Sequence, residues 1–178
     1  MACASYTGPL TLYTAQMELR SNLALSDDGA RLYGFMAAAD GSSSVLCVNS
    51  TDGVLLWASI PTSCVGPTES PGRNATFPLV FTDSPVVHPT TRSVIAVGAC
   101  GQLQVILYSL RGSFTPDGQA KTLPLAQLAE WNRTIALVSS SGTTSPVINQ
   151  GTRPLLDHQL PGGLISLTLR SSFNQATA

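Results

Sequence analysis

The stretch from Cys47 to Trp57, "CVNSTDGVLLW", predicts a strand, a tight turn and a second strand. Asp52-Gly53 is typical of a two-residue hairpin turn, in which the glycine supplies the positive φ. The Asn49 side chain can cap this turn as an aspartate would. Trp57 follows two leucines in a chain of which only 6% is aromatic. We therefore expect these turn residues and the tryptophan to be structural, with the indole packed between two sheets.

The composition of the 178-residue chain predicts an all-β fold. Apolar residues make up 43% of it, enough for a substantial core, and charged residues only 11%, well below the usual share of about a quarter. Ser, Thr, Gly and Pro supply the remaining polarity, which suits short strands joined by many turns. The net charge is −1 and no Lys/Arg cluster occurs, so a nucleic-acid partner is not expected.

Neither a membrane span nor a secretory signal is predicted. No apolar run reaches the roughly 20 residues that a membrane-spanning helix needs. The first ten residues, "MACASYTGPL", lack the basic and apolar regions of a signal peptide. This favours either an intracellular protein or a segment of a longer gene product.

Three similar stretches begin at Ser21, Ser84 and Ser145, at nearly equal spacing along the chain. In each, the serine opens a short apolar strand, a polar turn follows, and a second apolar run comes next. A Gly-centred turn then leads to a further strand, which in the last two copies alternates apolar and polar residues ("LQVILYSL", "LISLTL"). This pattern predicts repeated units of hairpin-linked strands.

Such units are expected to stack, because a small sheet cannot bury both of its faces alone. Their approximate bounds are 21–83, 84–144 and 145–178. The repeat is longer than the roughly 40 to 50 residues of a simple propeller blade. We assign the surplus to surface insertions at 61–74 and 113–132. Within the second insertion, "LPLAQLAEW" predicts about two helical turns or, equally, an irregular edge strand.

The stretch "CVNSTDGVLLW" resembles the run Ala-x-Asp-x-x-Thr-Gly-x-x-x-Trp of quinoprotein-like (pyrroloquinoline-quinone-type, PQQ) β-propeller repeats. Cys47 stands at the Ala position, Asn49 at the Asp and Asp52 at the Thr, while Gly53 and Trp57 are unchanged. The second copy ends in "YSLRGSF" without a tryptophan, and the third stops near where its tryptophan would fall. The resemblance implies antiparallel four-stranded blades of a β-propeller, about three in number, forming an incomplete ring.

The residues do not predict the chemistry of that family. Its quinone-dependent dehydrogenases bind the quinone beside a disulfide between adjacent cysteines, with calcium and an acidic base. This chain has no adjacent cysteines, and Asp27-Asp28 lie in a turn without the ligand pattern of a calcium loop. His88 and His158 fall at different repeat positions, and no G-x-S-x-G motif marks a nucleophile. We therefore assign no catalytic, cofactor-binding or metal-binding residue.

The first functional hypothesis is a non-catalytic interaction module that binds a protein or a glycan through loops or a blade edge. Further blades or self-association would be needed to cover the sheet edges of an open array. The alternative is part of a PQQ-dependent dehydrogenase. A further alternative is an extracellular β-sandwich adhesion domain, in which the spacing of the repeats would be a coincidence.

The four cysteines, Cys3, Cys47, Cys64 and Cys100, lack the spacing of a metal site. Their even number permits two disulfides, of which Cys47–Cys64 would close the shorter loop. A buried free thiol is the other interpretation of Cys47, and the apolar run "VLCV" favours it.

Three N-glycosylation sequons begin at Asn49, Asn74 and Asn132. Asn74 is the strongest candidate, because the Pro/Gly/Ser-rich stretch "PTESPGRNATF" around it is typical of a surface loop. Together the sequons and cysteines favour an extracellular or lumenal location, with the cytoplasm as the alternative.

Overall fold

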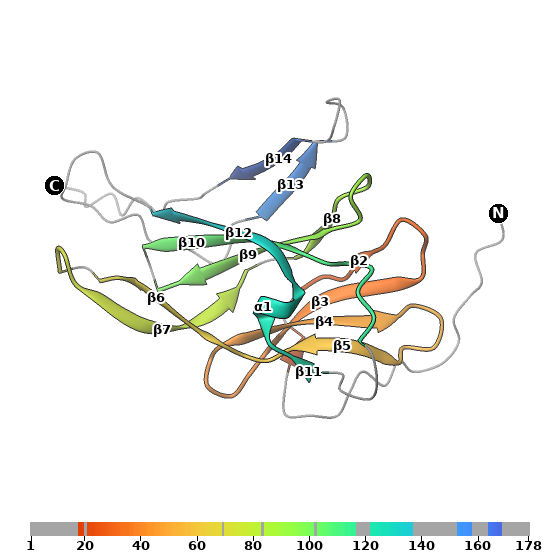
Figure 1. Ribbon diagram of the computed structural model, residues 1–178, viewed down its shortest axis with the longest axis horizontal. Helices are drawn as coiled ribbons and strands as arrows, with labels where there is room; N and C mark the ends of the chain where they lie inside the picture. The colour runs from red at the N-terminus through yellow and green to blue at the C-terminus, as the bar shows by residue number, and fades with distance from the viewer. Residues whose placement is uncertain are drawn as a thin grey trace, which may run out of the picture.

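The computed structural model describes residues 18–19, 21–68, 70–82, 84–101, 103–116, 122–136, 153–157 and 164–168. Within these residues the fold is mostly β with antiparallel sheets, as predicted: two six-stranded sheets and a separate hairpin (Figure 1). The described helix α1 (Leu125–Leu128) is a single turn. No helix in this described part of the chain is long and apolar enough to cross a membrane.

The first sheet has the strand order β1-β3-β4-β5-β11, and the short strand β2 also pairs with β3. Its neighbours are antiparallel, except that β11 runs parallel to β5. The strands are β1 (Glu18–Leu19), β2 (Ala24–Leu25), β3 (Arg31–Ala37), β4 (Ser43–Asn49), β5 (Leu55–Ser59) and β11 (Thr122–Leu123).

The second sheet has the order β12-β10-β9-β7-β6, and β8 also pairs with β9. All of these pairings are antiparallel, as is the separate β13–β14 hairpin. The strands are β6 (Ser63–Pro67), β7 (Asn74–Phe81), β8 (Val86–Val87), β9 (Val94–Cys100), β10 (Gln104–Leu110), β12 (Ala129–Ala136), β13 (Arg153–Asp157) and β14 (Leu164–Thr168).

The same antiparallel four-stranded meander occurs in both sheets with the same register. Strands β2-β3-β4-β5 of the first sheet correspond to β8-β9-β10-β12 of the second. Tyr33 pairs with Cys47 in the first sheet, and Ile95 pairs with Ser109 in the second. The sequence separation between Tyr33 and Ile95 is the same as that between Cys47 and Ser109, so the two strand pairs have the same register. The preceding strands β1 and β7 pair with β3 and β9 at the same offset. The chain therefore builds one sheet pattern twice.

The two tryptophans of the chain occupy equivalent positions in this pattern. Trp57 pairs with Cys47, and Trp131 pairs with Ser109. In both sheets a β-bulge follows directly after that cysteine or serine. The expectation that the second copy has no tryptophan is therefore wrong. Trp131 follows Ser109 much later in the chain than Trp57 follows Cys47, because an insertion separates β10 from β12.

Ser21 and Ser84, which the sequence pattern aligned, do not occupy equivalent positions in the two sheets. Equivalent residues of the two sheets are one position closer together in the sequence than Ser21 and Ser84 are. Ser84 corresponds to Asn22, not to Ser21. The Ser21 Oγ accepts a hydrogen bond from the Phe35 N–H at 2.8 Å, whereas the Ser84 Oγ accepts one from the Asn22 N–H at 3.2 Å. Ser145 lies outside the described residues.

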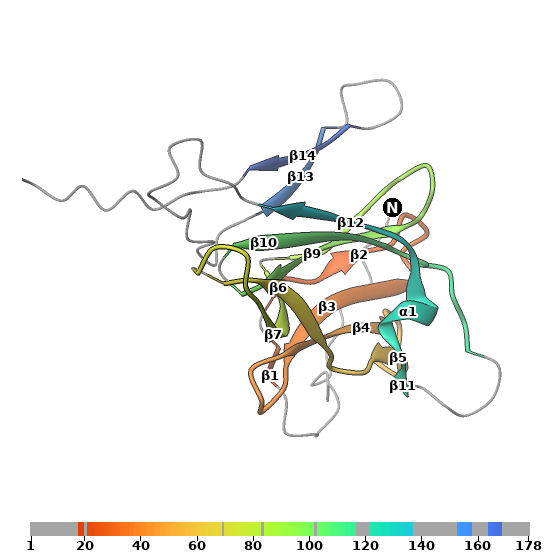
Figure 2. The same ribbon diagram turned by 60° about the vertical axis from the view of Figure 1, so that its left-hand side comes forward.

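The two sheets stack with the same face forward. Tyr33 and Trp57 of the first sheet pack in one core with Val94 and Tyr108 of the second. Ile95, the equivalent of Tyr33, points to the other side of the second sheet, where it is also buried. On that side β13 lies against β8 and β9, so the two sheets and the hairpin follow one another in layers (Figures 1 and 2).

The core between the sheets is apolar and aromatic. The Phe35 ring stacks on Phe81 across the layers with centroids 5.1 Å apart, and Phe81 meets Tyr108 edge-on at 5.7 Å. Trp57 is fully buried, and its ring centroid lies 6.2 Å from that of Tyr33. Trp57 thus lies between two sheets, where the sequence placed it.

The turn inside "CVNSTDGVLLW" is longer than the two-residue hairpin that Asp52-Gly53 predicted. The Asn49 N–H donates to the Val54 carbonyl at 2.8 Å, which leaves a loop of residues 50–53. Gly53 has the expected positive φ of 70°. The Asn49 Oδ1 accepts from the Thr51 N–H at 2.8 Å, so the predicted capping role is confirmed. The Asp52 Oδ1 likewise accepts from the Val54 N–H at 2.9 Å.

The predicted insertions contain more structure than surface loop. The stretch 61–74 contains β6, which forms a hairpin with β7. The second stretch, 113–132, contains β11, α1 and the start of β12. Each interpretation of "LPLAQLAEW" is thus partly right, with one helical turn followed at once by a strand.

We expect the two equivalent tryptophans to differ sharply in their contribution to stability. Trp57→Ala should lower the free energy of unfolding by about 3–5 kcal/mol, because it empties a buried site. Trp131→Ala should cost no more than about 1 kcal/mol, since its side chain is 41% exposed. Urea denaturation followed by far-UV circular dichroism measures both without relying on indole fluorescence. Equal costs would contradict the placement of Trp57 between the sheets.

Candidate functional site

A polar clamp joins the first sheet to the segment that follows β10. The Tyr33 hydroxyl donates to the Gly112 carbonyl at 2.7 Å, and the Arg31 Nη1 donates to the same oxygen at 2.7 Å. Arg31 also donates to the Phe114 carbonyl at 3.0 Å and to the Thr115 Oγ1 at 3.1 Å. One cation thus holds three groups of a segment that lies far along the chain from it.

A cavity of about 50 Å³ lies beside this clamp, lined among others by Asp28, Arg31, Tyr33 and Arg92. It is large enough for one or two water molecules and for little else. Hydrogen bonds from the Ser26 hydroxyl and the Ala30 N–H lower the pKa of the Asp28 carboxyl, so Asp28 stays ionised. The charged residues here stabilise the β2–β3 turn and the contact between the two sheets, and the cavity beside them is far smaller than an ordinary ligand pocket.

Cys47 is a fully buried free thiol that faces the same seam. Burial raises the pKa of this thiol from 9.0 to about 12, although the Arg31 charge acts in the opposite direction. Burial likewise raises the pKa of the Tyr33 phenol above its ordinary 10.0. A thiol this protonated is a poor nucleophile, which suits a packing role for Cys47.

A second candidate surface is the part of the second sheet that carries Trp131, which lies on β12 (Figure 1). Trp57 occupies the equivalent position in the first sheet and is fully buried, whereas Trp131 remains 41% exposed. Strand β13 lies against β8 and β9, and β10 separates these strands from β12. The described hairpin therefore does not cover the indole of Trp131, whose counterpart Trp57 is buried between the first and second sheets.

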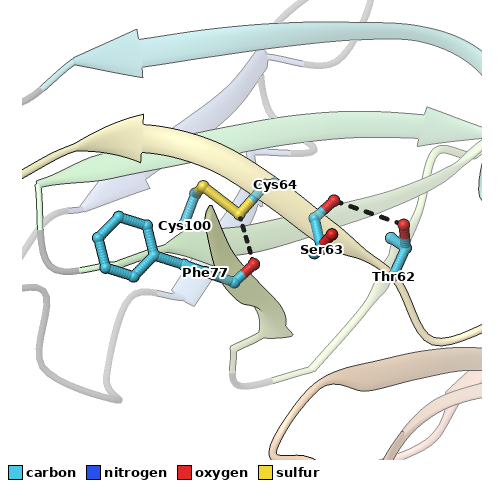
Figure 3. Close-up of a disulfide and its surroundings, with 5 residues drawn as sticks. All are labelled: Thr62, Ser63, Cys64, Phe77 and Cys100. Atoms are coloured by element: carbon cyan, nitrogen blue, oxygen red, sulfur yellow. Dashed lines mark hydrogen bonds between the residues drawn. A yellow bond between two sulfur atoms is a disulfide. The ribbon is translucent and has the colours of Figure 1, made fainter. Parts of the chain in front are cut away.

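The disulfide joins Cys64 to Cys100, with their Cα atoms 5.9 Å apart (Figure 3). The possible pairing of Cys47 with Cys64 therefore does not form, and the interpretation of Cys47 as a buried thiol is confirmed. Cys64 lies on β6 opposite Phe77, and Cys100 is the last residue of β9. Within the second sheet, the bond thus links the outer strand β6 to the end of β9 across the intervening strand β7. Cys3 lies outside the described residues.

An open groove of about 500 Å³ lies beside the disulfide, between the β6–β7 hairpin and the β9–β10 turn. Its volume is within the range of ligand pockets, and none of the described side chains that line it is ionisable. These described residues can accept an apolar group and supply no acid, base or metal ligand. The groove is lined by Pro67, Thr68, Ser70, Ala75, Phe77, Gly101 and Leu103.

The three sequon asparagines lie in different settings. Asn74 begins β7 and Asn132 lies within β12, and both are exposed. Asn49 is only half-exposed and is engaged in its turn.

His88 also has a structural place, because its Nδ1 accepts from the Thr90 and Thr91 N–H groups at 3.3 and 3.2 Å. His158 lies outside the described residues. No group of three His, Cys, Asp or Glu side chains in the described ranges lies close enough to hold a metal ion.

Comparisons with protein-family models, with curated protein sequences and with solved structures returned no match to this chain.

We expect stability to fall above pH 9, with Cys47 as a measurable cause. The unfolded chain ionises this thiol near pH 9, whereas the folded chain keeps it protonated to about pH 12. The folded state therefore binds the extra proton, and stability decreases by about 1.4 kcal/mol per pH unit within that window. Cys47→Ala should remove the Cys47 contribution to the slope of unfolding free energy against pH. The packing that the substitution loses lowers stability by the same amount at every pH, so it does not change this slope. Urea midpoints from pH 8 to pH 10 would show it, and identical slopes would contradict it.

Loss of the disulfide should destabilise the chain by about 2–4 kcal/mol, because the cross-link restricts the unfolded chain. The double substitution Cys64→Ala with Cys100→Ala tests this by urea denaturation. A reductant supplies the matched control, since it should shift the midpoint of the wild-type chain and leave that of the double variant unchanged. A wild-type midpoint that does not respond to full reduction would contradict the expectation.

Proposed function

We propose that this chain forms consecutive blades of a quinoprotein-like β-propeller, as an incomplete ring, and works as a non-catalytic interaction module. The observation that carries the proposal is the repeated meander. Two antiparallel sheets share register, bulge and tryptophan position, and they stack with the same face forward. A propeller is built by such repetition of four-stranded sheets. A β-sandwich requires no internal repeat, so the repeat favours blades over that alternative.

The surface that carries the interaction, in this proposal, is the part of the second sheet around Trp131, on the face whose strands β8 and β9 contact β13. In the first sheet the equivalent face packs on the next sheet, and Trp57 shares a core there with Leu110, Leu125 and Leu128. The same face of the second sheet keeps its indole 41% exposed. An aromatic residue with a large exposed area on a rigid strand is typical of the centre of a protein interface.

A protein partner that offers an apolar surface fits this face best. Inside the chain the equivalent face is covered by apolar side chains of a neighbouring sheet and of α1, and the Trp57 Nε1–H donates no hydrogen bond to a described residue. A further blade supplies a surface of that kind, whether it belongs to the same gene product, a second copy or another protein. A glycan ligand is the other partner class, and it would need hydrogen bonds that this pattern does not supply.

Photo-cross-linking tests the surface. A benzoylphenylalanine at position 131 should capture a protein partner in the cells that produce the chain, and the same group at position 65 should not. Val65 is a suitable control because it is 63% exposed and lies on β6. Trp131→Ala should weaken the captured interaction at least about tenfold, since truncation of a central interface tryptophan typically costs about 2 kcal/mol or more.

Equal cross-linking from both positions, or none from position 131, would contradict the proposed surface. The dehydrogenase alternative has its own test, a titration of the chain with PQQ and calcium followed by an assay of dye-linked substrate oxidation. Saturable quinone binding with turnover would overturn the non-catalytic proposal. Cross-links from position 131 to glycans alone would change the class of the partner.

A further inference from the structure

We propose that the folded chain carries N-linked glycans on Asn74 and Asn132, and not on Asn49, and that it matures in an oxidising compartment. The sequence shows three sequons of equal form. The structure separates them by exposure and by the hydrogen bonds of each asparagine. This inference is independent of the proposed interaction role.

Asn74 meets the steric needs of a glycan. It is exposed at the start of β7, and the sequon residue Thr76 is exposed as well. Its side-chain amide makes no hydrogen bond within the described part of the chain. Side chains alternate along a strand, and Ala75 and Phe77 line the groove, so Asn74 and Thr76 face away from it. A glycan at Asn74 therefore has room outside the hairpin and leaves the groove open.

Asn132 lies in the middle of β12, the terminal strand of the second sheet as described. Both Asn132 and Thr134 are exposed, and the Asn132 amide makes no hydrogen bond to a described residue. Asn132 pairs with Tyr108, so it projects from the face opposite to that of its neighbour Trp131. A bulky glycan here would hinder another chain from pairing with this sheet edge, and it would leave the Trp131 face free.

Asn49 is unsuited to a glycan in the folded chain. It is half-buried at the end of β4, and its Oδ1 accepts the Thr51 N–H at 2.8 Å. The next residue, Ser50, donates its hydroxyl to the Gly29 carbonyl. This bond holds the β4–β5 turn against the β2–β3 turn. A glycan on the Asn49 Nδ2 would have to leave this partly buried turn between two loops that are held together, so we infer that this sequon stays unmodified.

The Cys64–Cys100 disulfide points independently to the same kind of compartment. Disulfides persist in secreted and lumenal proteins, where glutathione and thioredoxin do not keep thiols reduced. N-glycans are transferred from a lipid-pyrophosphate oligosaccharide donor. The asparagine amide nitrogen forms a bond to C1 of the sugar, the bond from C1 to the pyrophosphate oxygen breaks, and the amide proton leaves with the lipid pyrophosphate. No oxidation or reduction accompanies this transfer.

Intact-mass measurement before and after peptide N-glycosidase treatment tests the assignment on protein purified from its natural source. The expected result is a mass decrease equal to two glycans. Secreted recombinant variants then assign the sites, with Thr76→Ala and Thr134→Ala each losing one glycan and Thr51→Ala losing none. These changes remove a sequon without altering its asparagine. Thr76→Ser and Thr134→Ser preserve the sequon and should retain both glycans.

Natural protein without any glycan would overturn the proposal, as would a glycan on Asn49 or the absence of one from Asn74 or Asn132. Non-reducing peptide mapping of the same sample provides a separate readout. It should recover the Cys64–Cys100 pair, and its recovery only as free thiols would overturn the inference about the compartment.

Discussion

A sheet with apolar side chains on both faces cannot stand alone in water, and this constraint organises the molecule. Val94 and Ile95 are neighbours on β9, so their side chains point to opposite sides, yet both are buried. The second sheet therefore needs cover twice, from the first sheet on one side and from further chain on the other. Burial of this kind contributes roughly 25 cal/mol for each Å² of apolar surface, which is the main driving force for stacking. Since the two sheets share one pattern and stack with the same face forward, the arrangement has no internal two-fold symmetry that would end it. Contacts of this heterologous type continue until a ring closes or a partner covers the last face.

Hydrophobic stacking is non-directional, so other contacts must set how the sheets sit on one another. Arg31 and Tyr33 do so through the Gly112 carbonyl, because both donors converge on one oxygen. Gly112 itself must be a glycine, since a Cβ there would lie 2.2 Å from the Arg92 carbonyl oxygen. The buried Trp57 Nε1 has no hydrogen-bond partner among the described residues, so the indole contributes shape and area but no direction. Buried aliphatic and aromatic side chains therefore supply the free energy of stacking, while Arg31 and Tyr33 fix how the two sheets are placed relative to one another.

Much of the fold could be predicted from local signals, and the errors have common causes. The strands around "VLCV" and "LQVILYSL" were predicted correctly because alternation and glycine turns are encoded by adjacent residues. Trp131 was missed because it lies inside the stretch 113–132, which was interpreted as a surface insertion and was therefore not aligned with the strand that contains Trp57. The disulfide could not be assigned from cysteine spacing, because loop length governs the entropy of the unfolded chain, whereas pairing depends on which sulfurs meet in the fold. Strand β6 was missed because its Pro- and Gly-containing sequence is atypical of a strand. The exposure that separates Asn49 from the other two sequons is a tertiary property, and no local motif contains it.

The stretch 113–132, which contains Trp131, also completes the first sheet. It supplies β11, which pairs in parallel with the outer strand β5 and whose Leu123 carbonyl accepts the Ile60 N–H at 2.8 Å. It then supplies α1, whose Leu125 and Leu128 are buried in the same core as Trp57. An exposed strand edge can pair with other chains. Strand β11 covers the edge of β5, and α1 packs in the core beside Trp57. The first sheet thus depends on the unit that follows it for both its open edge and its apolar face. By the same reasoning the exposed indole of Trp131, which lacks such a cover in the described chain, marks the part of the second sheet where a following unit or a partner has most to gain by binding.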